Sequence, residues 1–119
     1  MEDKTVFLEV FGDTPILRVL DFFVVNEDFD YSMKDIARHS EIGYATLKLI
    51  WPRLVDHEIV KQTRKVGKAK MYQLNHASKT VKMFRQLYWE VTKKEVHRFL
   101  KEEEEKERKS KKEKIELIT

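Results

Sequence analysis

The sequence contains no cysteine, and only three glycines and two prolines, among its 119 residues. The absence of cysteine excludes disulfides, thiolate metal sites and a cysteine nucleophile. The scarcity of glycine and proline argues against a β-sandwich with many tight turns and favours a mostly helical chain. No apolar run approaches the roughly 18 residues of a membrane span. The acidic N-terminal segment lacks the features of a signal peptide, so we expect a soluble, cytoplasmic protein with no membrane partner.

Charged residues are abundant, at 38% of the chain, but they are unevenly distributed. Residues 1–58 hold twelve acidic and six basic residues, whereas residues 59–85 hold eight basic residues and no acidic one. The basic residues of the second segment are Lys61, Arg64, Lys65, Lys68, Lys70, Lys79, Lys82 and Arg85. A contiguous basic block of this kind is the electrostatic footprint expected for a polyanionic partner.

Local patterns predict the order of the elements in the first half of the chain. Residues 4–11 alternate in side-chain character, which predicts a short strand or an extended arm that could serve as a third strand. A helix follows the cap at Thr14 and runs to about Val24. Ser32 caps a short helix over residues 33–39, and a three-residue turn leads to a helix over residues 44–56. Its unbroken apolar stripe favours one helix despite an internal proline.

The second half of the chain predicts a hairpin and a long helix. Residues 59–64 and 70–74 are two expected strands, joined by a turn in which Gly67 can take a positive φ. Ser78 caps the last helix, which we expect to reach about Lys112. Its apolar stripe gives way, from about residue 101, to a charged tail with no face to bury.

This order of elements resembles winged helix-turn-helix proteins, above all ArsR-like and MarR-like transcriptional regulators of the archaeal type. The segment SMKDIARHSEIGYATLKLIWPRLVDHEIVKQTRKVGKAKMYQL carries the resemblance. It implies a mainly α fold with a small β-hairpin wing, an α+β winged helix-turn-helix with a long C-terminal helix. We expect a DNA-binding domain over residues 1–76 and a C-terminal helix over residues 77–119. The chain departs from the usual pattern at Glu41 and Glu58, where such proteins usually have glycine.

The resemblance implies a homodimeric, sequence-specific regulator that binds double-stranded DNA. The N-terminal part of the third helix would reach base edges in the major groove, and the basic wing would lie on the minor groove or the backbone. The start of the second helix would hold phosphate. The predicted DNA-binding residues are Tyr44, Ala45, Thr46, Lys48, Arg53, Arg64, Lys65, Lys68, Lys70, Ser32, Lys34 and Arg38.

The stripe of the last helix predicts the dimer interface, at Val81, Phe84, Tyr88 and Val91. The alternative is that this stripe packs within its own subunit. No catalytic motif is present and the four histidines have no ligand spacing, so we expect no enzyme activity, no metal and no cofactor. An alternative function is a protein–protein adaptor that uses the wing and the charged helix without contacting DNA.

Overall fold

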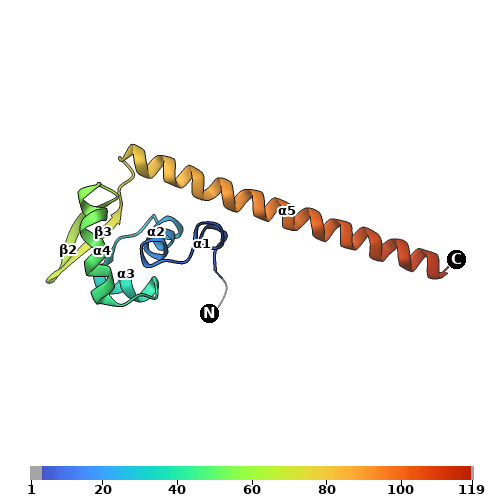
Figure 1. Cartoon of the computed structure of the whole chain (residues 1–119), viewed down its shortest axis with the longest axis horizontal. Helices are drawn as coiled ribbons and strands as arrows, with labels where there is room; N and C mark the ends of the chain where they lie inside the picture. Colours follow the sequence, from blue (N-terminus) through green and yellow to red (C-terminus); the bar gives the residue numbers. More distant parts are fainter. Residues whose placement is uncertain (1–3, 119) are drawn as a thin grey trace.

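The computed structural model of the chain describes residues 4–118. Figure 1 shows a group of short helices beside a small sheet, with one long helix projecting away from them. In chain order the elements are α1 (Val6–Phe11), α2 (Pro15–Val25), β1 (Tyr31–Ser32), α3 (Met33–His39), α4 (Tyr44–Asp56), β2 (Val60–Val66), β3 (Ala69–Leu74) and α5 (Lys79–Ile118). The long helix makes the molecule elongated, with extents of 72 × 29 × 25 Å.

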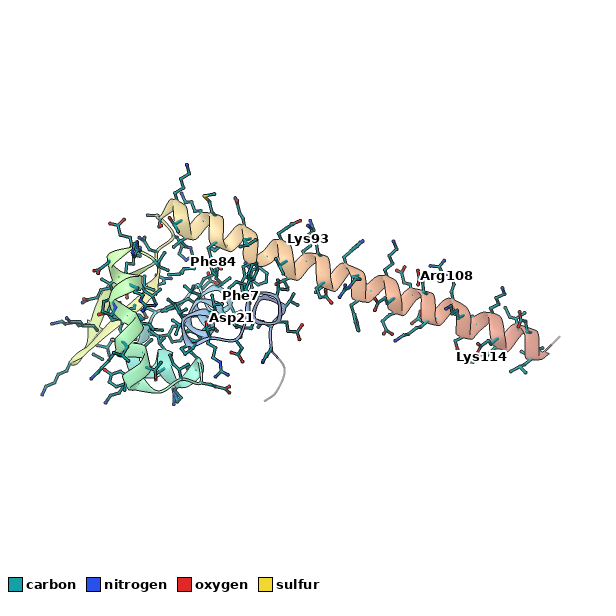
Figure 2. The ribbon with its side chains drawn as sticks, in the orientation of Figure 1. Phe7, Asp21, Phe84, Lys93, Arg108 and Lys114 are labelled. Atoms are coloured by element: carbon teal, nitrogen blue, oxygen red, sulfur yellow. The ribbon has the colours of Figure 1, made fainter. Side chains whose placement is uncertain are left out.

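The expectation of a strand or extended arm over residues 4–11 is wrong, because this segment contains helix α1. The Thr5 hydroxyl caps the helix by accepting a hydrogen bond from an amide of the first turn (3.3 Å). Phe7 is buried and lies against α5, on the side of Phe84 (Figure 2). Its ring centroid is 5.3 Å from that of Phe84 and 5.1 Å from that of Tyr88. Five of the six residues of α1 are apolar. Alternation therefore could not identify the secondary structure, and packing on α5 favours the helix.

The third strand of the sheet comes from a different part of the chain. β1 precedes α3 directly and pairs antiparallel with β3, which gives the strand order β1-β3-β2. Tyr31 lies opposite Tyr72 in this pairing. β2 and β3 form the expected hairpin, with an irregularity at Thr63, and Gly67 takes a φ of 62° at its tip. Two residues are too few to give a periodic signal, which is why the sequence did not reveal β1.

The helix-turn-helix has the predicted bounds. The Ser32 hydroxyl accepts a hydrogen bond from the backbone amide of Asp35 (3.2 Å), which fixes the start of α3. α4 begins after Gly43 and continues through Pro52 as one helix. The predicted helices over residues 33–39 and 44–56 are therefore confirmed.

The core lies where α2, α3 and α4 meet the sheet, and it extends under the first turns of α5. Its fully buried side chains include Val19, Phe23, Ile36, Leu47 and Leu74. These apolar residues hold α3 and α4 at a fixed angle to the wing. α5 is 40 residues long in total, and it continues beyond this core and past the end expected from the sequence.

Candidate nucleic-acid interface

Helix α4 is anchored on one side and open on the other. Leu47, Trp51 and Leu54 are buried in the core. Tyr44 and Lys48 are exposed at the border of this buried side, and the Lys48 ammonium lies 4.7 Å from the centroid of the Tyr44 ring. This cation–π contact joins a positive charge and a hydrogen-bonding hydroxyl at the N-terminal end of the helix.

The other predicted residues of α4 occupy different positions around the helix. Ala45 is exposed next to Tyr44, and Arg53 is exposed at the C-terminal end. Thr46 is partly covered. Because Thr46 and Arg53 are seven residues apart, they share one flank of the helix, away from Tyr44 and Lys48. The structure therefore divides the predicted residues of this helix between two faces.

A hollow of about 420 Å³ brings together three elements that are distant in sequence. Its lining comes from the start of α3, the start of α4 and the wing, and consists of Ser32, Met33, Lys34, Tyr44, Lys68, Ala69, Lys70 and Tyr72. Five of these residues were predicted to bind DNA. All three charged residues in the lining are lysines, and no acidic residue lines the hollow, so its field is positive.

The lining of the hollow includes residues that sequence reasoning did not identify. Met33, Ala69 and Tyr72 supply its apolar surface. Tyr72 is held in place by Trp51, whose ring lies nearly perpendicular to it at a centroid distance of 4.9 Å. Strand alternation in the wing was the signal that could have placed Tyr72 on this side.

Arg64 differs from the lysines of the wing because it is engaged by an acidic residue. Its guanidinium donates to both carboxylate oxygens of Asp30, at 2.9 and 3.0 Å. The hydroxyl of Thr63 donates to the same carboxylate at 2.5 Å. The hydrogen bond from Arg64, followed by that from Thr63, lowers the pKa of Asp30 to about 2. Arg64 therefore ties the wing to the loop before β1, with its charge largely compensated.

The remaining predicted cations fall into two groups. Arg38 pairs with Asp35 at 3.0 Å on the surface of α3. Lys65 is exposed near the tip of the wing, and neither it nor Lys34 forms an ion pair with any of residues 4–118. The lysines are thus the cations most available to an external anion, a distinction that composition alone could not make.

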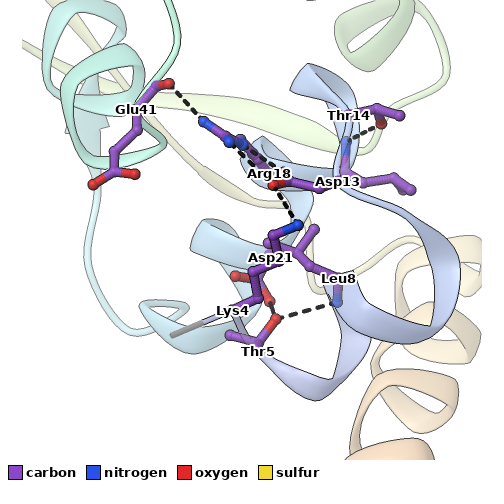
Figure 3. Close-up of polar contacts among 9 residues, drawn as sticks. Lys4, Thr5, Leu8, Asp13, Thr14, Arg18, Asp21 and Glu41 are labelled. Atoms are coloured by element: carbon purple, nitrogen blue, oxygen red, sulfur yellow. Dashed lines mark hydrogen bonds and ion pairs between the residues drawn. The ribbon is translucent and has the colours of Figure 1, made fainter. Parts of the chain in front are cut away.

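A second set of polar contacts fixes the turn between α3 and α4 (Figure 3). Arg18, on α2, donates to the backbone carbonyl of Glu41 in this turn at 2.8 Å. The same guanidinium holds the carboxylate of Asp13 at 2.5 and 3.1 Å, and Lys4 approaches that carboxylate at 3.3 Å. The hydrogen bond from Arg18 is the main reason that the pKa of Asp13 falls to about 2. The turn is therefore clamped to the α1–α2 connection.

Three of the four residues expected at the dimer interface pack within their own subunit. Val81 and Tyr88 are at most 2% exposed, and the ring of Phe84 packs edge-on against that of Phe7. The Tyr88 hydroxyl donates to Asp21 at 2.6 Å, and burial followed by this bond raises the pKa of Tyr88. Phe7 of α1, which the sequence did not reveal as a helix, packs on Phe84 and Tyr88, so this part of the stripe follows the alternative of packing within its own subunit. Val91 is only partly buried.

Within residues 4–118, no group of histidine, aspartate and glutamate side chains is arranged to hold a metal ion. None of the helices in this part of the chain combines the length and apolar character needed to cross a membrane.

Helix, helix-turn-helix, hairpin wing and long helix, in this order and packing, define a winged helix-turn-helix fold. No protein-family model matches the sequence, and no curated protein is significantly similar to it. Solved structures do share the fold. A mutant of ZitR from Lactococcus lactis in its apo form superimposes with a TM-score of 0.58 at 14% identity, over 87% of this chain and 82% of that chain.

Two further structures have the same architecture. MepR, a transcription regulator of the Staphylococcus aureus multidrug efflux pump MepA, gives a TM-score of 0.54 at 16% identity, over 85% of this chain and 76% of that chain. Wild-type ZitR in complex with DNA gives 0.53 at 16% identity, over 79% and 67%. The winged helix-turn-helix fold predicted from the sequence is thereby confirmed.

Proposed function

We propose that this chain is a transcriptional regulator that binds double-stranded DNA. The observation that carries the proposal is the hollow between the start of α3, the start of α4 and the wing, with Lys34, Lys68 and Lys70 in its lining. Because its charged side chains are all cationic, one phosphodiester backbone can pass through it while α4 enters the major groove. The solved structure of a neighbouring protein with this fold bound to DNA supports the proposal.

The two faces of α4 and the wing would have different tasks. Tyr44 and Lys48 would meet base edges together with the small side chain of Ala45, and Arg53 would contact the duplex further along. The lysines of the wing would contact phosphates, which carry no sequence information. Arg64 would position the wing through Asp30 rather than neutralise a phosphate, because its guanidinium is already engaged.

We further propose that the regulator is a homodimer. Past Val91 the apolar side chains of α5 are exposed, with Val96 at 50% and Phe99 at 58%. Val10 and Phe11 of α1 are exposed as well, at 58% and 45%. A second copy packed on these side chains would remove them from water and give a two-fold arrangement that reads two half-sites. The double variant F11E/F99E should therefore sediment as a monomer at 0.5 M salt, under conditions in which the wild type is a dimer.

The test of DNA binding is a fluorescence-anisotropy titration of a labelled random duplex at several salt concentrations. Each phosphate contact contributes about 0.9 to the slope of log affinity against log salt. K68Q/K70Q should therefore bind more weakly with a slope reduced by up to about 2, whereas the matched variant K93Q/K94Q, on α5, should behave like the wild type. Absence of binding at low salt would refute the proposal and favour a protein partner for the wing.

Sequence readout needs a second measurement, made once a preferred duplex has been selected. K48A should lose affinity for that duplex more than for random DNA, by about 1–3 kcal/mol. K65Q should lose affinity for both duplexes equally. Equal losses for the two variants on both duplexes would contradict this division of tasks.

A further inference from the structure

The distal half of α5 extends beyond the rest of the subunit. Figures 1 and 2 show it projecting alone, past Lys93 to Lys114 and the C-terminus. From Leu100 to Ile118 every residue is exposed except Glu103, which is partly covered. An isolated helix of this length receives no stabilisation from tertiary packing, so a stripe of apolar and charged residues along it is a candidate docking surface.

One face of this segment carries a regular pattern. Six residues follow one another at intervals of four, three, four, three and four: Leu100, Glu104, Glu107, Lys111, Lys114 and Ile118. This spacing keeps all six side chains on one narrow stripe of an α-helix, as at the seam of a two-helix coiled coil. The stripe has an apolar residue at each end, two glutamates in its first half and two lysines in its second half. Leu100 is 55% exposed and Ile118 is 84% exposed.

Within each half of the stripe the charges repel each other, although Glu107 and Lys111, which are four residues apart where the halves meet, attract. Glu104 and Glu107 are three residues apart, as are Lys111 and Lys114, and like charges at this spacing repel each other. Within residues 4–118, none of these four side chains forms an ion pair. Each half of the stripe therefore has a net charge that a complementary surface would compensate.

We propose that this stripe docks antiparallel onto the same stripe of a second copy of the chain. When the order of the stripe is reversed about Lys109, each glutamate takes the place of a lysine, and each apolar residue takes the place of the other. Leu100 would meet Ile118 of the second copy, Glu104 would meet Lys114, and Glu107 would meet Lys111. Two-fold symmetry repeats each contact, which gives four ion pairs between two apolar ends. A parallel pairing would instead place glutamate against glutamate and lysine against lysine.

The geometry makes this contact distinct from the dimer proposed above. Lys109 is 30 residues from the start of α5, or about 45 Å at 1.5 Å per residue. The two wings would therefore lie about 90 Å apart, whereas half-sites of one palindrome are about 34 Å apart. This consequence rests on the proposed DNA binding: the antiparallel contact would join two separate DNA-bound units rather than two halves of one site.

The test exploits the sign of the charges. E104K/E107K has only lysines in the middle of its stripe, and K111E/K114E has only glutamates. Each variant alone should lose at least about tenfold in the concentration-dependent association measured by sedimentation velocity at low salt. A mixture of the two should associate like the wild type. The fourfold variant E104K/E107K/K111E/K114E, in which the charges are exchanged, should do so too.

The direction of pairing is tested by cysteine cross-linking, which is unambiguous because the chain has no cysteine of its own. L100C mixed with I118C should form a mixed disulfide dimer under oxidising conditions, whereas I118C alone should not. A disulfide dimer of I118C alone would indicate parallel helices and overturn the proposal. Failure of the wild type to associate through this segment, or of the fourfold variant to recover association, would also overturn it.

The same charge variants should bind a short duplex containing a single site within about twofold of the wild type. That measurement separates the two proposals. A wild type that binds no DNA would refute the proposed function. A variant that has lost only the antiparallel contact would still bind a single site like the wild type.

Discussion

Helices α3 and α4 end in the same backbone motif, and in both the decisive position is occupied by an unfavourable residue. The amide of Ile59 donates to the carbonyl of Leu54 at 2.9 Å, and the amide of Glu58 donates to that of Val55 at 3.0 Å. This is the Schellman arrangement, whose first residue beyond the cap needs a left-handed backbone and is usually glycine. Glu58 has a φ of 56° there, as Glu41 has 57° at the end of α3.

Replacing Glu58 by glycine should stabilise the protein by about 1 kcal/mol. A Cβ atom in the left-handed region costs roughly 1–2 kcal/mol, and the greater freedom of glycine in the unfolded chain offsets part of the gain. The side chain of Asn75 donates to the backbone carbonyl of Glu58 at 2.9 Å, and this bond does not depend on the glutamate side chain. The melting temperature should rise by about 4 °C.

The assay is urea unfolding followed by circular dichroism, with Glu58→Ala as the matched control. Alanine removes the same charge but keeps the Cβ, so E58A should show no comparable gain. An equal gain in both variants would refute the backbone argument and assign the effect to charge. An unchanged stability for E58G would show that the left-handed strain is absent. Glu41→Gly should give a similar increase, since its backbone carbonyl would still accept the hydrogen bond from Arg18.

Phe7→Ala should lower the free energy of unfolding by about 3–5 kcal/mol, because the ring of Phe7 is buried against α5. Phe11→Ala removes a half-exposed ring and should lower it by less than about 1 kcal/mol. Equal effects of the two variants in a denaturant titration would contradict the packing of α1. The pKa values of Asp30 and Asp13 are about 2 in the folded protein, below the value of about 4 expected when unfolded. Their contribution to stability is therefore present above about pH 4 and lost as the pH falls towards 2. Asp30→Asn should make stability depend less on pH in this range, and an unchanged acid profile in unfolding measurements from pH 5 to 2.5 would contradict a stabilising ion pair between Asp30 and Arg64.

The sequence by itself determined the elements whose signals are local. Ser32 and Gly43 mark the starts of α3 and α4, and the turn at Gly67 marks the tip of the wing, because caps and tight turns depend on a few neighbouring residues. The acid-free segment over residues 59–85 identified the basic wing in the same way. These signals were sufficient to place most of the residues that line the hollow.

Only the tertiary structure decided the features that depend on contacts between distant residues. The apolar character of α1 allowed a strand as well as a helix, and the rings of Phe84 and Tyr88 determined the outcome. The same packing places the apolar stripe of the first turns of α5 in the core of its own subunit, and not at the expected interface between subunits. Asp30 is 34 residues from Arg64, so no local pattern could show that the one compensates the other. Such contacts are set by where the chain returns in space, which a pattern of neighbouring residues does not encode.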